Sequence, residues 1–166
     1  MNVVIRLSEI SDAESIAQIY NREVLESFST FDLRPRTIEE QLDLMRGHGG
    51  AYPITVATIE DKIAGFASLS PYKIRPGYST TVENSVYVAK QFRNLKIGTT
   101  LLEDIILKAR LHGFHTIIAR VSNQNLASSR LHETCGFNLV GIEKEVGRKF
   151  GRWLDVSIYQ LMLASG

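Results

Sequence analysis

The chain has 166 residues, a length that fits one domain with a hydrophobic core of its own, and we expect that domain to span residues 1–166. Its 44% hydrophobic and 22% charged residues are ordinary for a globular protein, and a net charge of +1 gives no broad attraction to nucleic acid or to an anionic membrane. The single Cys135, the lack of a signal-peptide pattern and the lack of an apolar run of roughly 18 residues favour a cytoplasmic protein, and no Cys/His cluster has the spacing of metal ligands, so no metal is expected.

The first half of the chain predicts a strand, two helices and a strand hairpin. Ser11 with Glu14, and Thr37 with Glu40, have the spacing of capping boxes, which mark the first residues of helices. An irregular loop over residues 28–35 is expected between these two helices. The apolar runs expected to form strands are residues 3–7, 54–59 and 62–72, the last two joined by a turn at residues 60–61.

The second half predicts alternating strands and helices. A central amphipathic helix is expected over residues 97–112, with Gly113 as its C-terminal cap, and a short helix over residues 125–135, ended by Gly136. The remaining apolar runs predict strands at residues 81–88, 115–121, 137–145 and 154–163, with a loop at residues 146–153. This order of elements indicates a mixed α/β (α+β) fold, in which hairpins and a helical crossover give a mixed sheet.

One segment brings a possible catalytic carboxylate close to an anion site. Glu83 stands near the start of the strand at residues 81–88, and the polar loop after that strand opens the central helix. The first backbone N–H groups of a helix have no intrahelical partner, so they bind anions well. A base candidate so close to an anion cradle indicates an enzyme that uses a phosphorylated cofactor.

The element order and two motifs resemble the GCN5-related N-acetyltransferase (GNAT) superfamily over essentially the whole chain. The first motif is Arg93-Asn94-Leu95-Lys96-Ile97-Gly98, and the second is Asn125 opening a short helix that ends in Gly136-Phe137. The strings at residues 81–88, 130–133 and 149–155 are similar to those of the phosphinothricin and methionine sulfoximine acetyltransferase subgroup. The resemblance implies a mixed, mostly antiparallel sheet with helices on both faces, and a homodimer. It also implies direct acetyl transfer from acetyl-CoA to the α-amine of a small amino-acid analogue.

The resemblance implies that acetyl-CoA binds to the backbone of the strand at residues 81–88 and to the first motif. The implied cofactor-binding residues are Val86, Tyr87, Val88, Arg93, Asn94, Leu95, Lys96, Ile97, Gly98, Thr99, Asn125 and Ser128. Lys96 departs from the family, which usually has glycine at this position. We expect the loop to keep its shape only if Lys96 has a negative φ, and we expect binding to survive because Gly98 and the helix N-terminus remain.

The resemblance also suggests the catalytic groups. Glu83 would accept a proton from the acceptor amine, directly or through water, and a solvated or salt-bridged strand carboxylate is the alternative. His132 occupies the position where many members have a tyrosine that protonates the leaving thiolate, and a histidine on the helix surface is the alternative. Cys135 lies on the apolar stripe of the same helix, so we expect it in the core and not as a nucleophile.

The acceptor is expected to be anionic, because cations precede the catalytic strand. The implied acceptor-binding residues are Phe31, Lys73, Arg75, Tyr78, Glu83, Asn84 and Ser85. The resemblance puts Lys149 and Trp153, in the expected loop at residues 146–153, near the acceptor, and a buried Trp153 is the alternative. Two other functions stay open. One is an acetyltransferase for a different amine, such as a protein N-terminus, a polyamine or an aminoglycoside, and the other is a non-catalytic acyl-CoA sensor.

Overall fold

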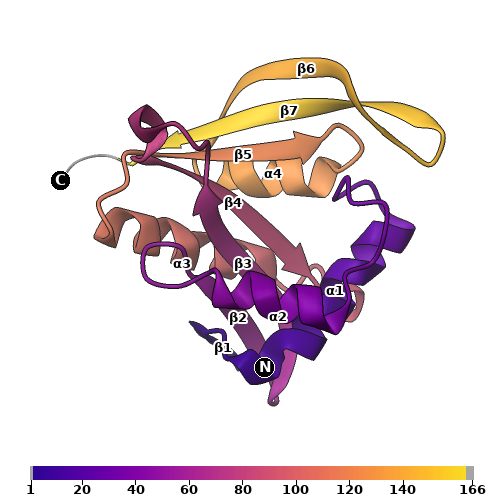
Figure 1. Cartoon of the computed structure of the whole chain (residues 1–166), viewed down its shortest axis with the longest axis vertical. Helices are drawn as coiled ribbons and strands as arrows, with labels where there is room; N and C mark the ends of the chain where they lie inside the picture. The colour runs from indigo at the N-terminus through magenta and orange to yellow at the C-terminus, as the bar shows by residue number, and fades with distance from the viewer. Residues whose placement is uncertain (1, 164–166) are drawn as a thin grey trace.

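The computed structural model describes residues 2–163, and within them seven strands form a single sheet in the order β1-β2-β3-β4-β5-β7-β6 (Figure 1). Neighbouring strands are antiparallel except β4 and β5, which are parallel. The strands are β1 (Val3–Leu7), β2 (Ile54–Ile59), β3 (Lys62–Pro71), β4 (Thr81–Val88), β5 (Thr116–Ser122), β6 (Asn138–Lys149) and β7 (Arg152–Met162). The helices are α1 (Ala13–Glu26), α2 (Ile38–Arg46), α3 (Ile97–Leu111) and α4 (Leu126–Thr134). The predicted mixed, mostly antiparallel sheet is confirmed.

Helices cover both faces of the sheet, as predicted. Alternate residues of a strand point to opposite faces, and the two core clusters follow this alternation. On β2, Val56 belongs to the cluster built with α1 and α2, whereas Ala57 belongs to the cluster built with α3. The α3 cluster is the larger one, and its Leu101 and Ile105 are fully buried. Among residues 2–163, no helix has the length and apolar character that crossing a membrane requires.

The sheet is divided between β4 and β5. These strands pair only from Thr81 to Glu83 on β4 and from Thr116 to Ile118 on β5. By contrast, β4 pairs with β3 from Val82 to Val88. Figure 1 shows β4 and β5 running apart from their short paired region. The second half of β4 therefore has one side without a neighbouring strand, and a space opens between the two halves of the sheet.

One of the two predicted capping boxes is confirmed and the other is wrong. The Glu40 N–H donates to Thr37 Oγ1 at 3.2 Å, and the Thr37 N–H donates to Glu40 Oε2 at 2.8 Å, as predicted for α2. Before α1, the box is formed by Glu9 and Asp12 around a short 3₁₀ turn, two residues earlier than predicted. Asp12 is fixed there because Arg6 of β1 donates two hydrogen bonds to its carboxylate, at 2.7 and 2.9 Å. Sequence spacing carries no information on this tertiary partner.

The loop predicted at residues 146–153 is also wrong, because β6 and β7 continue through most of it. Their pairing extends to Lys149 and Arg152, and only Phe150 and Gly151, both with positive φ, form the turn. The register shifts between Glu143 and residue 147, which breaks the alternation that identifies a strand in a sequence. Lys149 and Trp153 therefore lie on strands, and Trp153 is 58% exposed, so the buried alternative is wrong as well.

Candidate active site

A cleft of about 760 Å³ lies where β4 and β5 run apart. Its walls are the second half of β4, the second half of β5, the first turn of α3, one side of α4, and the end of α1 with the residues that follow it. Backbone groups of β4 that have no partner strand face this space. An extended chain that enters the cleft can therefore pair with β4 as an added strand would.

The first turn of α3 forms an anion cradle at one end of the cleft. Asn94, Lys96, Ile97, Gly98 and Thr99 line this end. The N–H groups of the last three residues are the first of the helix and have no intrahelical acceptor. At Gly98, an added Cβ would lie 3.3 Å from Leu131 of α4, so glycine keeps this end of the cleft open.

The expectation that Lys96 has a negative φ is wrong. Lys96 is the N-cap residue of α3 with a φ of 60° and a ψ of 11°, in the left-handed region, and Asn94 has a φ of 63°. The loop thus keeps the backbone shape that glycine would take, and the lysine side chain is carried at a conformational cost. The chain can bear this cost because its anchors on both sides, β4 and α3, are packed in the core.

Arg93 is engaged by the protein itself. Its guanidinium forms an ion pair with Glu23 at the end of α1, and its Nε donates to the Val88 carbonyl oxygen at 3.3 Å. Glu23 is buried and also accepts a hydrogen bond from Ser27 Oγ at 2.6 Å. Arg93 therefore ties the end of α1 to the end of β4, next to the anion cradle.

His132 is buried, so the alternative of a surface histidine is wrong. Its Nδ1 lies 2.7 Å from the Ser128 carbonyl oxygen, and its Nε2 lies 3.0 Å from Asn84 Nδ2. A carbonyl oxygen can only accept, so Nδ1 carries the ring proton and Nε2 accepts from the Asn84 amide. Burial lowers the pKa of His132, which keeps the ring neutral near pH 7. Asn84 Oδ1 is buried and has no hydrogen-bond partner within residues 2–163.

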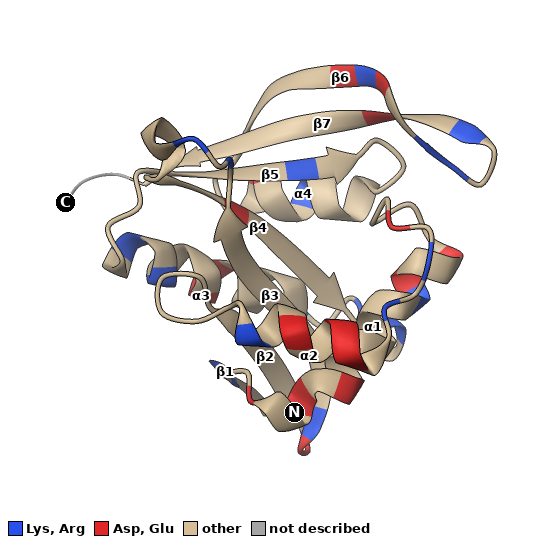
Figure 2. Cartoon of the chain, viewed as in Figure 1, with Lys and Arg blue, Asp and Glu red and all other residues tan. Residues whose placement is uncertain are grey.

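Glu83 lies at the last paired position between β4 and β5, immediately before the cleft-lining part of β4. Burial raises the pKa of its carboxyl group, and the positive charge of Arg120 on β5 partly opposes the rise. Figure 2 shows an acidic segment on β4 beside a basic segment on β5. Arg120 in turn pairs with Glu143 of β6 at 2.5 Å. Glu83 is thus a half-buried carboxylate next to a cation at the point where the sheet divides.

The structure brings most of the predicted site residues together on the cleft. The predicted residues that line it are Asn84, Ser85, Val86, Tyr87, Val88, Arg93, Asn94, Lys96, Ile97, Gly98, Thr99, Asn125, Ser128 and His132. Glu83 adjoins them. The predicted residues that do not line it are Phe31, Lys73, Arg75, Tyr78 and Leu95. Lys73 lies 5.2 Å from the Tyr78 ring in the β3–β4 connection, and Cys135 packs against the α3 core as predicted.

Sequence reasoning missed two walls of the cleft. One is the end of α1 with residues 27–29, and the other is the part of β5 that includes Arg120. The predicted helix cap at Asn125 is confirmed, since its Oδ1 accepts from the Ser128 N–H at 3.1 Å, and its Nδ2 donates to Ser29 Oγ at 3.1 Å. A charged residue inside an otherwise apolar strand was the available signal for Arg120. No sequence pattern indicates the contact between Ser29 and α4.

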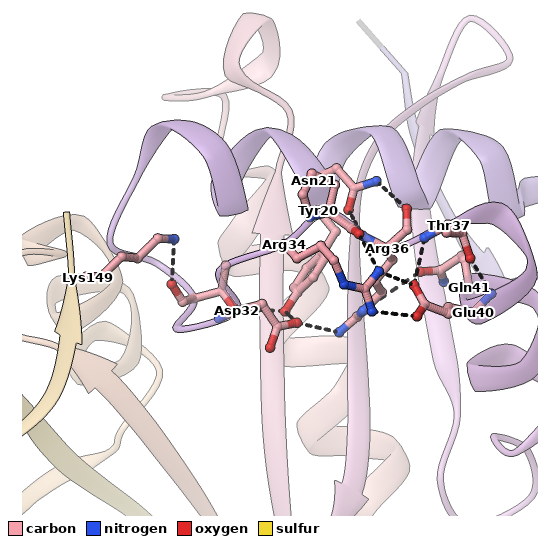
Figure 3. Close-up of polar contacts among 11 residues, drawn as sticks. Tyr20, Asn21, Asp32, Arg34, Arg36, Thr37, Glu40, Gln41 and Lys149 are labelled. Carbon is pink, nitrogen blue, oxygen red and sulfur yellow. Dashed lines mark hydrogen bonds and ion pairs between the residues drawn. The ribbon is translucent and has the colours of Figure 1, made fainter.

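The loop between α1 and α2 is fixed by polar contacts beside the cleft (Figure 3). The Asn21 side chain donates to the Arg36 carbonyl oxygen at 2.9 Å and accepts from the Arg36 N–H at 2.8 Å. The Tyr20 hydroxyl bonds to Thr30 Oγ1 at 2.8 Å and to the Asp32 carboxylate. These contacts hold the irregular loop beside the cleft although it contains no helix or strand.

The hairpin of β6 and β7 is attached to the same loop. Lys149 Nζ donates to the Thr30 carbonyl oxygen at 2.8 Å, and the lysine is only 2% exposed (Figure 3). Burial lowers the pKa of its ammonium group. Phe31 packs directly on Gly147, where an added Cβ would lie 2.1 Å from Phe31 Cε2. The loop and the hairpin therefore form one wall next to the cleft.

A seven-stranded sheet divided at β4 and β5, with an anion cradle at a helix N-terminus, forms a cleft suited to an extended, phosphorylated ligand. The family model described as "Acetyltransferase (GNAT) domain" matches residues 5–158. The chain therefore belongs to the GNAT family of N-acetyltransferases.

Two relatives and one solved structure show which acetyltransferases of this family the chain is similar to. The chain is 38% identical over 162 residues to a phosphinothricin N-acetyltransferase from Streptomyces coelicolor, with 95% of each chain covered. It is 34% identical over 162 residues to an L-methionine sulfoximine/L-methionine sulfone acetyltransferase from Salmonella typhimurium, covering 97% of this chain and 95% of the relative. A solved GNAT phosphinothricin acetyltransferase from Sinorhizobium meliloti, in complex with AcCoA, has a TM-score of 0.93 and 32% identity. That comparison covers 100% of this chain and 91% of the solved one.

Proposed function

We propose that this protein transfers an acetyl group from acetyl-CoA directly to the α-amine of small amino-acid analogues such as methionine sulfoximine, methionine sulfone or phosphinothricin. The observation that carries the proposal is the place of Glu83, a half-buried carboxylate at the point where β4 and β5 separate. The names of the similar enzymes supply the acceptor class. Arg75 and Lys73, in the connection that leads into β4, add positive charge suited to an anionic acceptor.

The residues of the cleft fit acetyl-CoA. The N–H groups of Ile97, Gly98 and Thr99 would hold the pyrophosphate, and the unpaired side of β4 would hold the pantetheine arm. Acetyl-CoA supplies the activated acetyl thioester. With Asn94 and Lys96 both left-handed, successive N–H groups of this loop converge, which favours an anion.

Glu83 acts as the general base under this proposal. An α-ammonium group must lose a proton before its nitrogen can attack, so a base has to face the amine. Burial raises the pKa of Glu83 and makes it a better proton acceptor, while Arg120 limits the rise. The raised pKa therefore brings the Glu83 carboxyl group closer to the range in which a general base works at neutral pH.

His132 positions Asn84 instead of acting as an acid. Its one ring proton is committed to the Ser128 carbonyl oxygen, and its Nε2 accepts from Asn84. The imidazole fixes the Asn84 amide with Oδ1 unpartnered at the wall of the cleft. His132→Gln should lower kcat and leave the shape of the pH–rate profile intact. An alkaline loss of wild-type activity that disappears in this variant would restore the acid role.

The direct test is a CoA-release assay with methionine sulfoximine, methionine sulfone, phosphinothricin and common amines. Glu83→Gln should lower kcat about 10²- to 10⁴-fold, the usual contribution of a general base. Glu39→Gln, an exposed carboxylate on α2, is the matched control and should retain full activity. Cys135→Ala should also remain active, because burial raises the pKa of that thiol and transfer is direct. Wild-type kcat in Glu83→Gln would refute the base.

The proposal includes a homodimer and a cytoplasmic location. β6 is an edge strand, and it exposes Leu139, Val140, Ile142 and Val146 together with Trp153 of β7. An apolar sheet edge of this kind favours association with a second copy. Light scattering after size exclusion should give about twice the 18.6 kDa chain mass. Val140→Glu should shift the protein towards the monomer, and a monomeric wild type would contradict the dimer.

A further inference from the structure

A second, smaller cavity of about 150 Å³ lies on the α1/α2 side of the sheet. We call it the side cavity, and its polar lining residues are Tyr20, Arg36, Gln41, His48, Ser68, Ser70, Ser85 and Tyr87. Ser85 and Tyr87 of β4 line both the side cavity and the large cleft. The two spaces are therefore neighbours along the strand that carries Glu83.

The lining of the side cavity is rich in hydrogen-bond donors. Within residues 2–163, no Asp or Glu side chain lines it. Arg36, stacked at 3.6 Å on the Tyr20 ring, makes one long hydrogen bond to Gln41 Oε1 at 3.4 Å and lies 3.7 Å from Asp32 Oδ2. Figure 3 shows the Arg36 side chain between Asp32 and Gln41. A guanidinium has five N–H donors, and within residues 2–163 the hydrogen bond to Gln41 is the only one that the Arg36 side chain makes.

Gln41 adds a second donor without an acceptor to the side cavity. This glutamine is 0% exposed, and its Nε2 has no hydrogen-bond partner within residues 2–163. Its orientation is fixed by Arg36, because a guanidinium can only donate and the amide oxygen must face it. Buried amide N–H groups almost always have an acceptor. The side cavity therefore contains hydrogen-bond donors that oxygen atoms of a ligand would satisfy.

We propose that the side cavity binds an oxygen-bearing head of the acceptor, either its α-carboxylate or its side-chain sulfone or phosphinate oxygens. The inference rests on the proposed function, and it names residues that would select such acceptors. Glu83 and Ser85 lie on one face of β4, about 7 Å apart. Ser70 and Ser68 of β3 are their cross-strand neighbours. A small amino acid with its amine at Glu83 can thus extend its polar head past Ser85 into the side cavity.

Gln41→Glu tests the proposal with an almost isosteric change. The new carboxylate keeps an oxygen facing Arg36 and replaces the donor in the cavity with an acceptor, which repels an oxygen head. The KM for methionine sulfone should rise at least about tenfold, the effect of losing a hydrogen bond to a charged group. The KM for acetyl-CoA should not change. Gln18→Glu, an exposed position on α1, controls for the added charge.

Two acceptor analogues distinguish the two heads. If the carboxylate occupies the side cavity, the KM penalty disappears with 3-(methylsulfonyl)propylamine, which keeps the sulfone and lacks the carboxylate. If the side-chain oxygens occupy it, the penalty disappears with norleucine. Ser70→Ala, which removes one hydroxyl and little volume, should raise the KM for methionine sulfone about threefold even if Gln41→Glu fails to fold. An unchanged KM in both variants, or an equal penalty with hexylamine, overturns the proposal.

Calorimetric titration separates this inference from the proposed function. If no amine is acetylated, the proposed function fails, and binding of methionine sulfone is then measured directly. Binding to the wild type that weakens at least about tenfold in Gln41→Glu supports the side cavity without turnover. Absence of binding to the wild type overturns it.

Discussion

Lys96 carries a long side chain on a left-handed backbone. A non-glycine residue in the left-handed region costs about 1–2 kcal/mol, part of which glycine recovers. Lys96→Gly should therefore stabilise the protein by about 1 kcal/mol and raise Tm by about 2–4 °C. The KM for acetyl-CoA should not rise, since backbone N–H groups form the cradle.

Lys90→Gly is the matched control for Lys96→Gly. Lys90 is an exposed lysine six residues earlier, in a 3₁₀ turn, and it has no positive φ. There glycine adds unfolded-chain entropy without relieving strain, so Tm should fall slightly. Equal changes in the two variants, measured by thermal unfolding, would show that Lys96 carries no strain.

Glu83 links activity to pH and stability. Its folded pKa is raised, so its contribution to stability is fully present below the unfolded pKa of 4.5 and is lost as pH rises through the folded pKa. Above the folded pKa the protein bears an ionised, half-buried carboxylate. Glu83→Gln should therefore raise Tm at pH 7, by about 1–3 °C, while the gain vanishes near pH 4.

The same pKa shift predicts the pH profile of the enzyme. Wild-type activity should rise with pH through the raised pKa of Glu83, because only the ionised carboxylate accepts a proton. Glu39→Gln, measured in parallel, should show neither the stability gain nor the change in activity. A Glu83→Gln protein less stable than the wild type at pH 7 would mean that Arg120 outweighs burial.

At the scale of elements, Gly147 of β6 sets the position of the loop between α1 and α2. A Cβ there would overlap Phe31, so Gly147→Ala must displace the ring. We expect a loss of about 1–3 kcal/mol of stability and a higher KM for the acceptor. Gly141→Ala is the control on the same strand, because nothing lies within 4 Å of its added Cβ. Equal unfolding free energies in the two variants would contradict the packing.

Most elements were predictable from the sequence, and the failures have physical causes. Helices α2 and α3 and strands β2 and β4 have strong apolar periodicity and local caps, so their positions follow from nearby residues. The predicted strands of the β6–β7 hairpin are shorter than the observed ones, because the outer half of the hairpin is polar, exposed and bulged. The residues of β4, α3 and α4 that line the cleft could be predicted because they belong to family motifs. The side cavity and the contact of Lys149 with Thr30 join residues far apart in sequence, which no motif marks.

At the scale of the whole molecule, the divided sheet predicts strong stabilisation by acetyl-CoA. The pantetheine arm would supply the pairing that β4 lacks, and the pyrophosphate would satisfy the first turn of α3. At 100 times its Kd the ligand adds about 2.7 kcal/mol, which corresponds to a Tm increase of about 5–10 °C. Pantetheine, which lacks the phosphates, should give a smaller shift in the same thermal scan. A Tm independent of acetyl-CoA would contradict the assignment of the cleft.

The division of the sheet also separates a wall made of main chain from a wall made of side chains, and these differ in how freely their residues can be substituted. The wall for the acyl donor is largely main chain, from β4 and from the first turn of α3, so most side-chain substitutions leave it intact. The side cavity proposed for the acceptor is lined by side chains, among them those of Arg36, Gln41 and Ser70. Relatives 38% and 34% identical to this chain carry the names of different acceptors. A substitution on the acceptor side can therefore change which amine is bound while the acetyl-donor site is retained.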